Sequence, residues 1–317
     1  MEPASVTRFR EYLKIETVHP TPDYQKCTEF LVQQAEEIGL ECKVVELVKG
    51  KPVVIMKLEG TDPSLPGILL NSHTDVVPVY REKWNYEPFE ATRVEIESGD
   101  HRIYARGSQD MKVTGSLYLE AFREIKESGK KFLRNVYSTF VPDEEIYSIE
   151  GMMPFSKSQE FKDMNIGFGI DEEGGKQPNV VPATYSATFD LRITPLVNLD
   201  EFYKYLEDLA ATNDCEIEFY YRDESDKSAK ITDSNSFLIA LKSTCSKMGL
   251  NPIEIIFPAA TDARFVRQAG IQAIGINPML NHPVLAHDHD EYVVESEFIK
   301  AIPFYTDLIE GLASISE

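Results

Sequence analysis

The sequence predicts an α/β protein in which helices cover a largely parallel, mixed β-sheet. Hydrophobic residues recur alternately at helical and at strand-like spacing over residues 1–175, and the same alternation returns from residue 234. Strands that alternate with helices of this length favour parallel pairing. The 317 residues are 42% hydrophobic and 27% charged, an ordinary globular composition that excludes global disorder, collagen and coiled coil.

The elements of the first half follow from this spacing. Apolar residues in 23–40 lie on one helical stripe, and Gly39 is suited to end that helix. A second helix is expected over 111–127. Five β-rich runs are expected to form strands, at residues 42–47, 52–58, 67–73, 134–141 and 165–170. Sheets of this kind bind ligands at the carboxyl ends of their strands.

Residues 176–227 have a different pattern. Apolar and polar residues alternate over 185–193, which is typical of a strand with one face in water. A short helix over 202–209 and a strand at 216–221 are expected next. We therefore expect a small β-α-β insertion in this part of the chain.

The C-terminal part returns to the α/β pattern. A helix that starts near residue 234 is followed by apolar runs at 254–257 and 271–276, which are expected to be strands separated by another helix. A histidine-rich loop at 282–289 and a terminal helix follow.

The chain carries 53 acidic and 32 basic residues, a formal net charge of −21. Nucleic-acid phosphates and anionic bilayers repel such a protein, so we expect neither as a partner. No apolar run approaches the ~18 residues of a membrane helix, and the first residues lack a signal-peptide pattern, so we expect a cytoplasmic protein. The four cysteines are scattered without a CxxC pair, which indicates reduced thiols and leaves histidines and carboxylates as metal ligands.

Candidate functional residues begin at the end of the third expected strand. His73 and Asp75 lie two positions apart there, so both side chains face the same side. The pair suits a metal ligand with its neighbour or a general-base pair, although a strand-end histidine bonded within a turn gives the same pattern. Asp110 precedes the helix at 111–127, where an aspartate can be a metal ligand or a simple N-cap.

Two acidic clusters and one histidine-rich loop add further candidates. Each acidic cluster directly follows an expected strand and can be a solvated loop. In a metal site, adjacent acids can divide the work, so that one binds the ion while the other moves protons. The candidates are Glu144 and Glu145, then Asp171, Glu172 and Glu173, and finally His282, His287 and His289.

These side chains are expected to gather at one side of the sheet. His73, Asp110, the two acidic clusters and His287 together offer two imidazoles, several carboxylates and no thiol, which is the ligand chemistry of two zinc ions that share one carboxylate. Serine-nucleophile, P-loop and dinucleotide-binding motifs are absent from the sequence. The residue types alone therefore favour a metal site.

Seven motifs occur in order along the chain: LLNSHTDVVPV, YARGSQDMK, FVPDEE, FGIDEEG, NVVPATYSATFDLR, PAATDARFVR and HDHDE. They resemble the zinc-dependent aminoacylase-1 family, which belongs to a larger group of metallo-exopeptidases and amidohydrolases. The resemblance extends from about residue 5 to residue 315 and implies a zinc exopeptidase-like fold.

The resemblance implies a site with two zinc ions per chain. The ligands would be His73 and Glu172 for one ion, Glu145 and His287 for the other, and Asp110 as the bridge between them. Of the two histidines in HDHDE, His287 fits because Glu291 follows it by four residues, as in the family pattern.

The resemblance also implies catalytic and substrate-binding residues. Asp75 would fix the orientation of His73, and Glu144 would be the general base. Arginine suits the α-carboxylate of an N-acyl amino acid by bidentate pairing. The substrate pocket would be lined by Arg192, Thr261 and Arg264.

The sequence departs from the family in the insertion. Members carry a larger lid between the FGIDEEG and NVVPA motifs, and its first half, missing here, contains a Gly-His pair whose histidine reaches the active site across a dimer interface. Residues 1–175 and 228–317 would be the zinc-binding catalytic domain and residues 176–227 a remnant of the lid and dimerisation domain, with the homodimer weakened or lost. Members also usually carry glycines where this chain has Tyr147 and Ser148.

The leading hypothesis is hydrolysis of N-acyl-L-amino acids to a carboxylate and a free L-amino acid, impaired by the missing half of the lid. One alternative is a catalytically inactive zinc-binding remnant that acts through protein contacts. Another is a dipeptidase or carboxypeptidase on the same scaffold. The PAATDARF and HDHDE motifs favour an aminoacylase.

Overall fold

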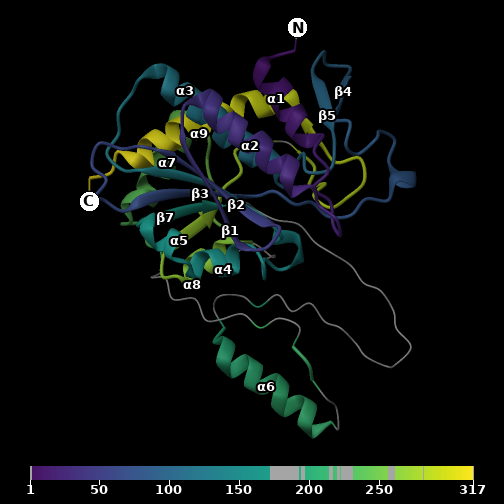
Figure 1. Cartoon of the computed structure of the whole chain (residues 1–317), viewed down its shortest axis with the longest axis vertical. Coiled ribbons are helices and arrows are strands. Elements are labelled where there is room, and N and C mark those ends of the chain that lie inside the picture. The colour runs from purple at the N-terminus through teal and green to yellow at the C-terminus, as the bar shows by residue number, and fades with distance from the viewer. Residues whose placement is uncertain are drawn as a thin grey trace.

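A computed structural model of the chain describes residues 2–171, 193, 197–213, 217–219, 222, 231–255, 261–280 and 282–316. At its centre is a six-stranded mixed sheet with the strand order β1-β2-β6-β3-β7-β8 (Figure 1). β3 pairs in parallel with β6 and β7, and β7 with β8, whereas β1 with β2 and β2 with β6 are antiparallel. The strands are β1 (Glu41–Val48), β2 (Lys51–Leu58), β3 (Gly67–His73), β6 (Val136–Val141), β7 (Ile166–Asp171) and β8 (Gln272–Gly275). This sheet confirms the predicted fold class.

Buried apolar side chains cover both faces of the sheet. One face packs against α1 (Ala4–Leu13), α2 (Tyr24–Ile38), α3 (Lys112–Ser128), α7 (Ser236–Lys247) and α9 (Glu295–Ala313). The other packs against α4 (Met152–Lys157), α5 (Gln159–Asp163) and α8 (Ala263–Gln268), so the sheet lies between two helical layers (Figure 1). Neighbouring residues of β3, Ile68 and Leu69, belong to opposite cores, which explains why this strand is apolar at almost every position.

The two helices expected in the first half are confirmed as α2 and α3. Gly39 follows α2 in the left-handed conformation, with φ 75°, which a residue without Cβ adopts readily. The strand expected at 254–257 is not present in its described part, because residues 254 and 255 are irregular. Ile253 and Ile255 are 82% and 61% exposed, so the described residues here do not form a buried strand.

A second, three-stranded sheet was not expected from the sequence. It contains β4 (Thr92–Glu95), β5 (His101–Tyr104) and β9 (Tyr292–Val294), in this order and antiparallel throughout. Pairing of β5 with β9 brings the histidine-rich loop beside the segment that precedes Asp110. Two short 3-10 helices, η1 (Arg81–Lys83) and η2 (Glu144–Ile146), lie in loops.

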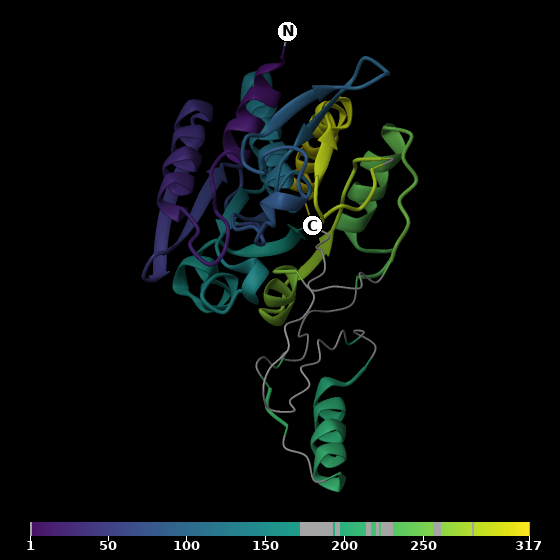
Figure 2. The same ribbon diagram turned by 90° about the vertical axis from the view of Figure 1, so that its right-hand side faces the viewer.

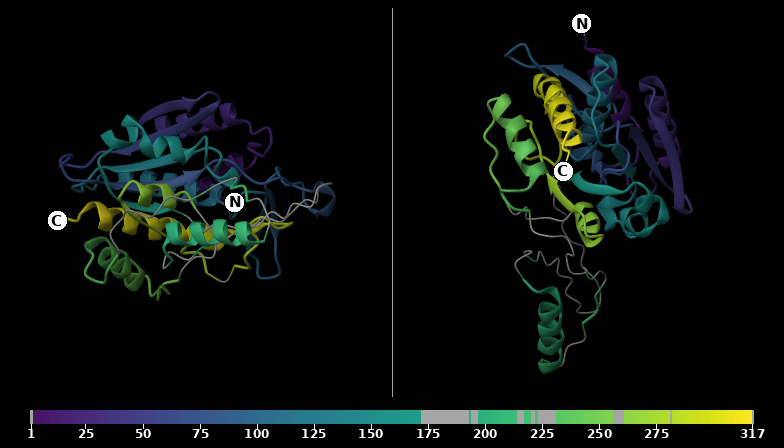
Figure 3. Two further views of the ribbon diagram at one scale, coloured as in Figure 1. Left: turned by 90° about the horizontal axis from the view of Figure 1, so that it is seen from below. Right: turned by 90° about the vertical axis from the view of Figure 1, so that its left-hand side faces the viewer.

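The described helix of the insertion lies apart from the sheet. This helix, α6 (Leu199–Thr212), contains the expected helix at 202–209 and is capped by Asn198, whose Oδ1 accepts from two backbone amides. Figures 2 and 3 show it separated from the rest of the described fold. Of the strands expected at 185–193 and 216–221, only residues 193 and 217–219 are described, and the domain boundaries stay a prediction. No helix in the described ranges is long and apolar enough to cross a membrane.

Candidate metal centre

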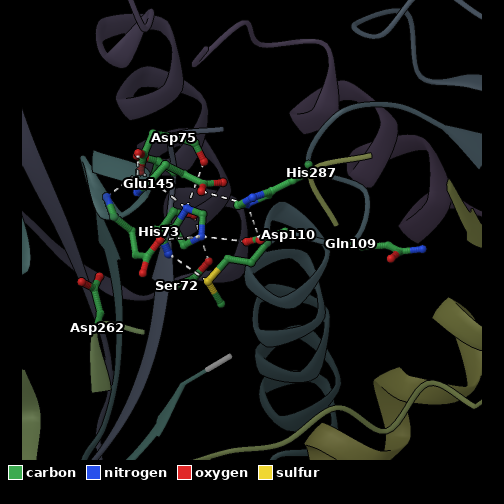
Figure 4. Close-up of polar contacts among 12 residues, drawn as sticks. Ser72, His73, Asp75, Gln109, Asp110, Glu145, Asp262 and His287 are labelled. Atoms are coloured by element: carbon green, nitrogen blue, oxygen red, sulfur yellow. Dashed lines mark hydrogen bonds and ion pairs between the residues drawn. The ribbon is translucent and has the colours of Figure 1, made fainter. Parts of the chain in front are cut away.

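Acidic residues and histidines from four segments meet at the carboxyl ends of β3 and β6 (Figure 4). The segments are the end of β3, the loop before α3, η2 and the loop before β9, and they carry His73 and Asp75, Asp110, Glu144 and Glu145, and His287, respectively. Parallel strands end at the same edge of a sheet, so residues far apart in the sequence come together here. The expected convergence is therefore present for these six residues.

Asp110 lies between the two histidines. Its Oδ1 is 3.0 Å from Nε2 of His73 and its Oδ2 is 3.0 Å from Nε2 of His287. Glu145 Oε2 is 2.9 Å from the same His287 nitrogen, whereas Glu144 Oε2 is 3.9 Å from His73 Nε2. The alternative role of Asp110 as a helix cap is wrong, because Met111 is the N-cap of α3 and no side chain caps this helix.

The electrostatics of the site favour a bound cation. Burial opposes ionisation of Asp110, but contacts with His287 and His73 hold its pKa well below its usual range. Burial, followed by the charge of Asp110, raises the pKa of Glu145 to about 7. Burial works against a charged His287, yet its bonds to Asp110 and Glu145 raise its pKa to about 11. Two close carboxylates thus require a positive charge, which falls on this imidazole in the metal-free protein and which a bound metal ion would supply instead.

The donor set fits a divalent metal ion. Ligand atoms of His73, Asp110 and Glu145 all lie within 4.8 Å of one another. Glu145 Oε1 is buried and has no hydrogen-bond donor among the described residues. Imidazole nitrogens with carboxylate oxygens and without thiolates are ligands that zinc and related ions accept.

Asp75 connects the ligands to one another. Nδ1 of His73 is 2.9 Å from the backbone oxygen of Asp75 and 3.5 Å from its carboxylate. With the proton on Nδ1, the Nε2 lone pair would be available to a metal ion. The two carboxylate oxygens of Asp75 accept from the backbone amides of Glu144 and Glu145, each at 3.1 Å. Asp75 thus sets both the tautomer of His73 and the place of the acidic pair.

The loop that carries the acidic pair has a constrained backbone. Asp143, Tyr147 and Ser148 have φ values of 64°, 77° and 55°, in the left-handed region that favours glycine. The side chains of Asp143 and Ser148 are anchored, since Tyr24 donates to Asp143 Oδ1 at 2.6 Å and Ser148 Oγ donates to Asp262. Tyr147 and Ser148, which stand where members of the resembling family usually carry glycines, thus adopt the backbone conformation that glycine favours.

Glu291 holds the loop that carries His287. This fully buried carboxylate accepts from Arg106 Nη1 at 2.7 Å and from the backbone amides of Gly107, Gln109 and Asp110. The sequence indicated Glu291 only as a spacing marker. Its position joins the loop before α3 to the loop before β9, so it fixes the distance between Asp110 and His287.

The predicted substrate-binding residues are only partly described. Glu172 of the ligand set and Arg192 of the pocket lie outside the described residues. Thr261 is 9% exposed, and its hydroxyl accepts from the amide of Ala263 at the start of α8. Arg264 Nη2 donates to the backbone oxygen of Tyr147 at 3.2 Å, which places it beside the acidic-pair loop.

Comparisons with known proteins show what the whole chain is similar to. The chain matches the model of peptidase family M20/M25/M40 over residues 69–311. It is 36% identical to aminoacylase-1 of Mus musculus, over 99% of this chain and 96% of that protein, and 32% identical to aminoacylase-1 of Dictyostelium discoideum, over 98% of each. Since the mouse alignment has 397 positions and this chain has 317 residues, about 80 positions have no counterpart here.

The fold is also found among solved structures. The M20 family metallo-carboxypeptidase Sso-CP2 of Sulfolobus solfataricus superposes with a TM-score of 0.79, over 99% of this chain and 100% of that one. Its sequence is 15% identical, so this likeness concerns the fold alone.

Proposed function

The chain belongs to peptidase family M20/M25/M40, a family of metal-dependent hydrolases, and we propose that it hydrolyses N-acyl-L-amino acids with two zinc ions. Similarity to aminoacylase-1 over 99% of the chain supports the reaction. The carboxypeptidase of Sulfolobus shares the fold at 15% identity, which gives the peptidase alternative no comparable support.

The observation that carries this proposal is the position of Asp110. Its two carboxylate oxygens each lie 3.0 Å from a different histidine, so Asp110 would be the ligand that two ions share. His73, with Glu172, would hold one ion, and Glu145 and His287 would hold the other. Zinc supplies a Lewis acid and brings the pKa of a bound water to about 7.

Glu144 is the residue we propose for proton transfer. Glu144 and Glu145 lie together in the 3-10 helix η2, which follows β6. The carboxylate of Glu144 is 3.9 Å from His73 Nε2, whereas that of Glu145 is 2.9 Å from His287 Nε2. Glu144 would accept a proton from the attacking water and deliver it to the leaving nitrogen. Arg192 and Arg264, with Thr261, would bind the carboxylate end of the substrate.

We propose that the shortened insertion impairs this reaction. The missing half of the lid would carry a histidine that stabilises the tetrahedral intermediate, and loss of one such donor costs ~10²-fold or more in rate. Residues 1–175 and 228–317 would still form the zinc-binding domain. Because the lid remnant at 176–227 is small, the homodimer would be weak or absent.

The test is turnover of N-acetylmethionine by the purified protein with its zinc content measured in the same sample. We expect slow release of methionine that stops on chelation and returns with zinc. Compared with a relative that has the full lid, kcat should fall far more than KM rises, and sedimentation should show mainly monomer. Two bound zinc ions without any turnover would instead favour the inactive-remnant alternative. A kcat equal to that of the full-lid relative would contradict the impairment.

A further inference from the structure

Asp75 depends on a donor that lies outside the predicted site. Its carboxylate is completely buried and already accepts from the backbone amides of Glu144 and Glu145. Two side-chain nitrogens also face it: Nε2 of His19 is 2.9 Å from Asp75 Oδ2, and Nδ1 of His73 is farther away, at 3.5 Å from Oδ1. The orientation of Asp75 therefore rests on both neighbours of the carboxylate, the acidic-pair loop on one side and His19 on the other.

His19 is fixed in the segment between α1 and α2. Its backbone amide donates to the oxygen of Val76 at 3.3 Å, next to an isolated bridge between Val18 and Val76. Its side chain is 9% exposed and also lies 3.8 Å from Oδ1 of Asp143. Since carboxylates surround Nε2, this nitrogen carries the proton and donates it to Asp75.

The cluster of His19, Asp75 and Asp143 has the spacing of a metal site but not its chemistry. Ligand atoms of the three residues lie within 4.8 Å of one another. However, the Asp143 carboxylate accepts from Tyr24 at 2.6 Å and has the ammonium of Lys51 2.6 Å away. A lysine thus occupies the place of a cation, and Asp75 has its own donors, so the cluster is a hydrogen-bonded support.

We propose that His19 is a positioning residue that, through Asp75, holds Glu144, Glu145 and the metal-ligating face of His73 in place. This inference rests on the metal site of the proposed function. A donor at position 19 keeps the Asp75 carboxylate turned towards the amides of the acidic pair. Without it, Asp75 can rotate, and the pair loses its place relative to Asp110 and His287.

The test compares His19→Gln with His19→Met. The two side chains have similar length and volume, but only glutamine can donate to Asp75. Zinc affinity is measured by competition with a chelator, without substrate. We expect H19M to bind zinc ~10- to 100-fold more weakly than the unmodified protein, as for other outer partners of metal ligands, and H19Q to stay within a few-fold. With N-acetylmethionine, H19M should lose kcat with little change in KM.

His101 provides the matched control. It lies on β5 in the other sheet, where its ring contacts Arg93 at 3.1 Å, and it has no contact with Asp75. H101M should bind zinc as the unmodified protein does. If H19M fails to fold, H19A replaces it as the variant without a donor.

Three results would overturn the inference. The first is equal zinc affinity of H19Q and H19M, whether both are reduced or both are normal. The second is a third zinc ion that is lost in both variants, which would make the cluster a metal site. The third is a chain that binds no zinc at all. Absence of turnover in the unmodified protein would refute the proposed reaction, and the affinity comparison would still decide the role of His19.

Discussion

Replacement of Glu291 by alanine should destabilise the protein strongly, although Glu291 is neither a proposed ligand nor a proposed catalyst. The residue is 0% exposed and its partner Arg106 is 2% exposed. E291A leaves the Arg106 guanidinium buried without its carboxylate, and three backbone amides lose their acceptor. Removing one partner of such a buried pair costs about 3–5 kcal/mol. E291Q keeps an acceptor oxygen but not the charge, so its loss should be intermediate.

The assay is urea unfolding of the metal-free protein, so that zinc binding does not add to the measured free energy of unfolding. The single tryptophan, Trp84, is a local probe, because the Arg106 guanidinium lies 5.4 Å from its ring, and circular dichroism reports the whole fold. Glu41→Ala is the control, since the pair of Glu41 with Lys57 spans two strands at the surface and is worth about 0–1 kcal/mol.

A loss of less than about 1 kcal/mol in E291A, close to that of the control, would refute the reasoning. It would mean that water replaces the carboxylate at no cost, and that Glu291 does not hold the two loops together. In the expected case, the melting temperature falls by about 10 °C, because each kcal/mol of lost stability lowers the melting temperature of a protein of this size by a few degrees.

Three further predictions concern the centre of the site. Asp110→Ala should lower zinc occupancy at both positions, because Asp110 contacts both histidines, and elemental analysis showing two retained ions would contradict the bridge. Glu144→Gln should keep the zinc and lose turnover, whereas Glu145→Ala should lose zinc as well; identical behaviour of the two variants would contradict the division of roles. Burial, followed by the charge of Asp171, raises the pKa of Asp262 to about 7, above its value in the unfolded chain. The stabilising contribution of protonated Asp262 is therefore present in acid and is lost as the pH rises to about 7. In metal-free protein, the free energy of unfolding of Asp262→Asn should depend less on pH between about 4 and 7 than that of the parent.

The sequence could predict those residues of the site that lie at the ends of strands. His73 ends one apolar strand, Glu144 and Glu145 follow another, and parallel pairing of the two strands brings all three residues to one edge. Asp75 lies two residues from His73, but the other supports that the structure adds come from distant segments. His19 lies in an irregular stretch, and no periodic pattern indicates that it reaches Asp75.

Short elements were the main failure of sequence reasoning about the fold. The strands β4, β5 and β9 have four, four and three residues, too few for an alternating pattern to stand out. Their pairing is nevertheless what places the loop of His287 beside Asp110. Conversely, the apolar run near Ile255 suggested a strand, although Ile255 is 61% exposed. An apolar residue can be buried, but whether it is buried depends on which elements pack over it in the folded chain.

The direct pairing of β7 with β8 has a consequence for how this protein could evolve. The two strands run in parallel, with Ile170 opposite Ile274 and Asp171 opposite Gly275, although the whole insertion lies between them in the sequence. Their register is fixed by the sheet itself, so the intervening chain can lengthen or shorten without displacing a core strand. Entropy opposes such changes weakly, since doubling the length of a flexible loop costs only about 0.6 kcal/mol. We therefore expect the insertion to vary in length among relatives while the strands that carry the proposed metal ligands keep their places.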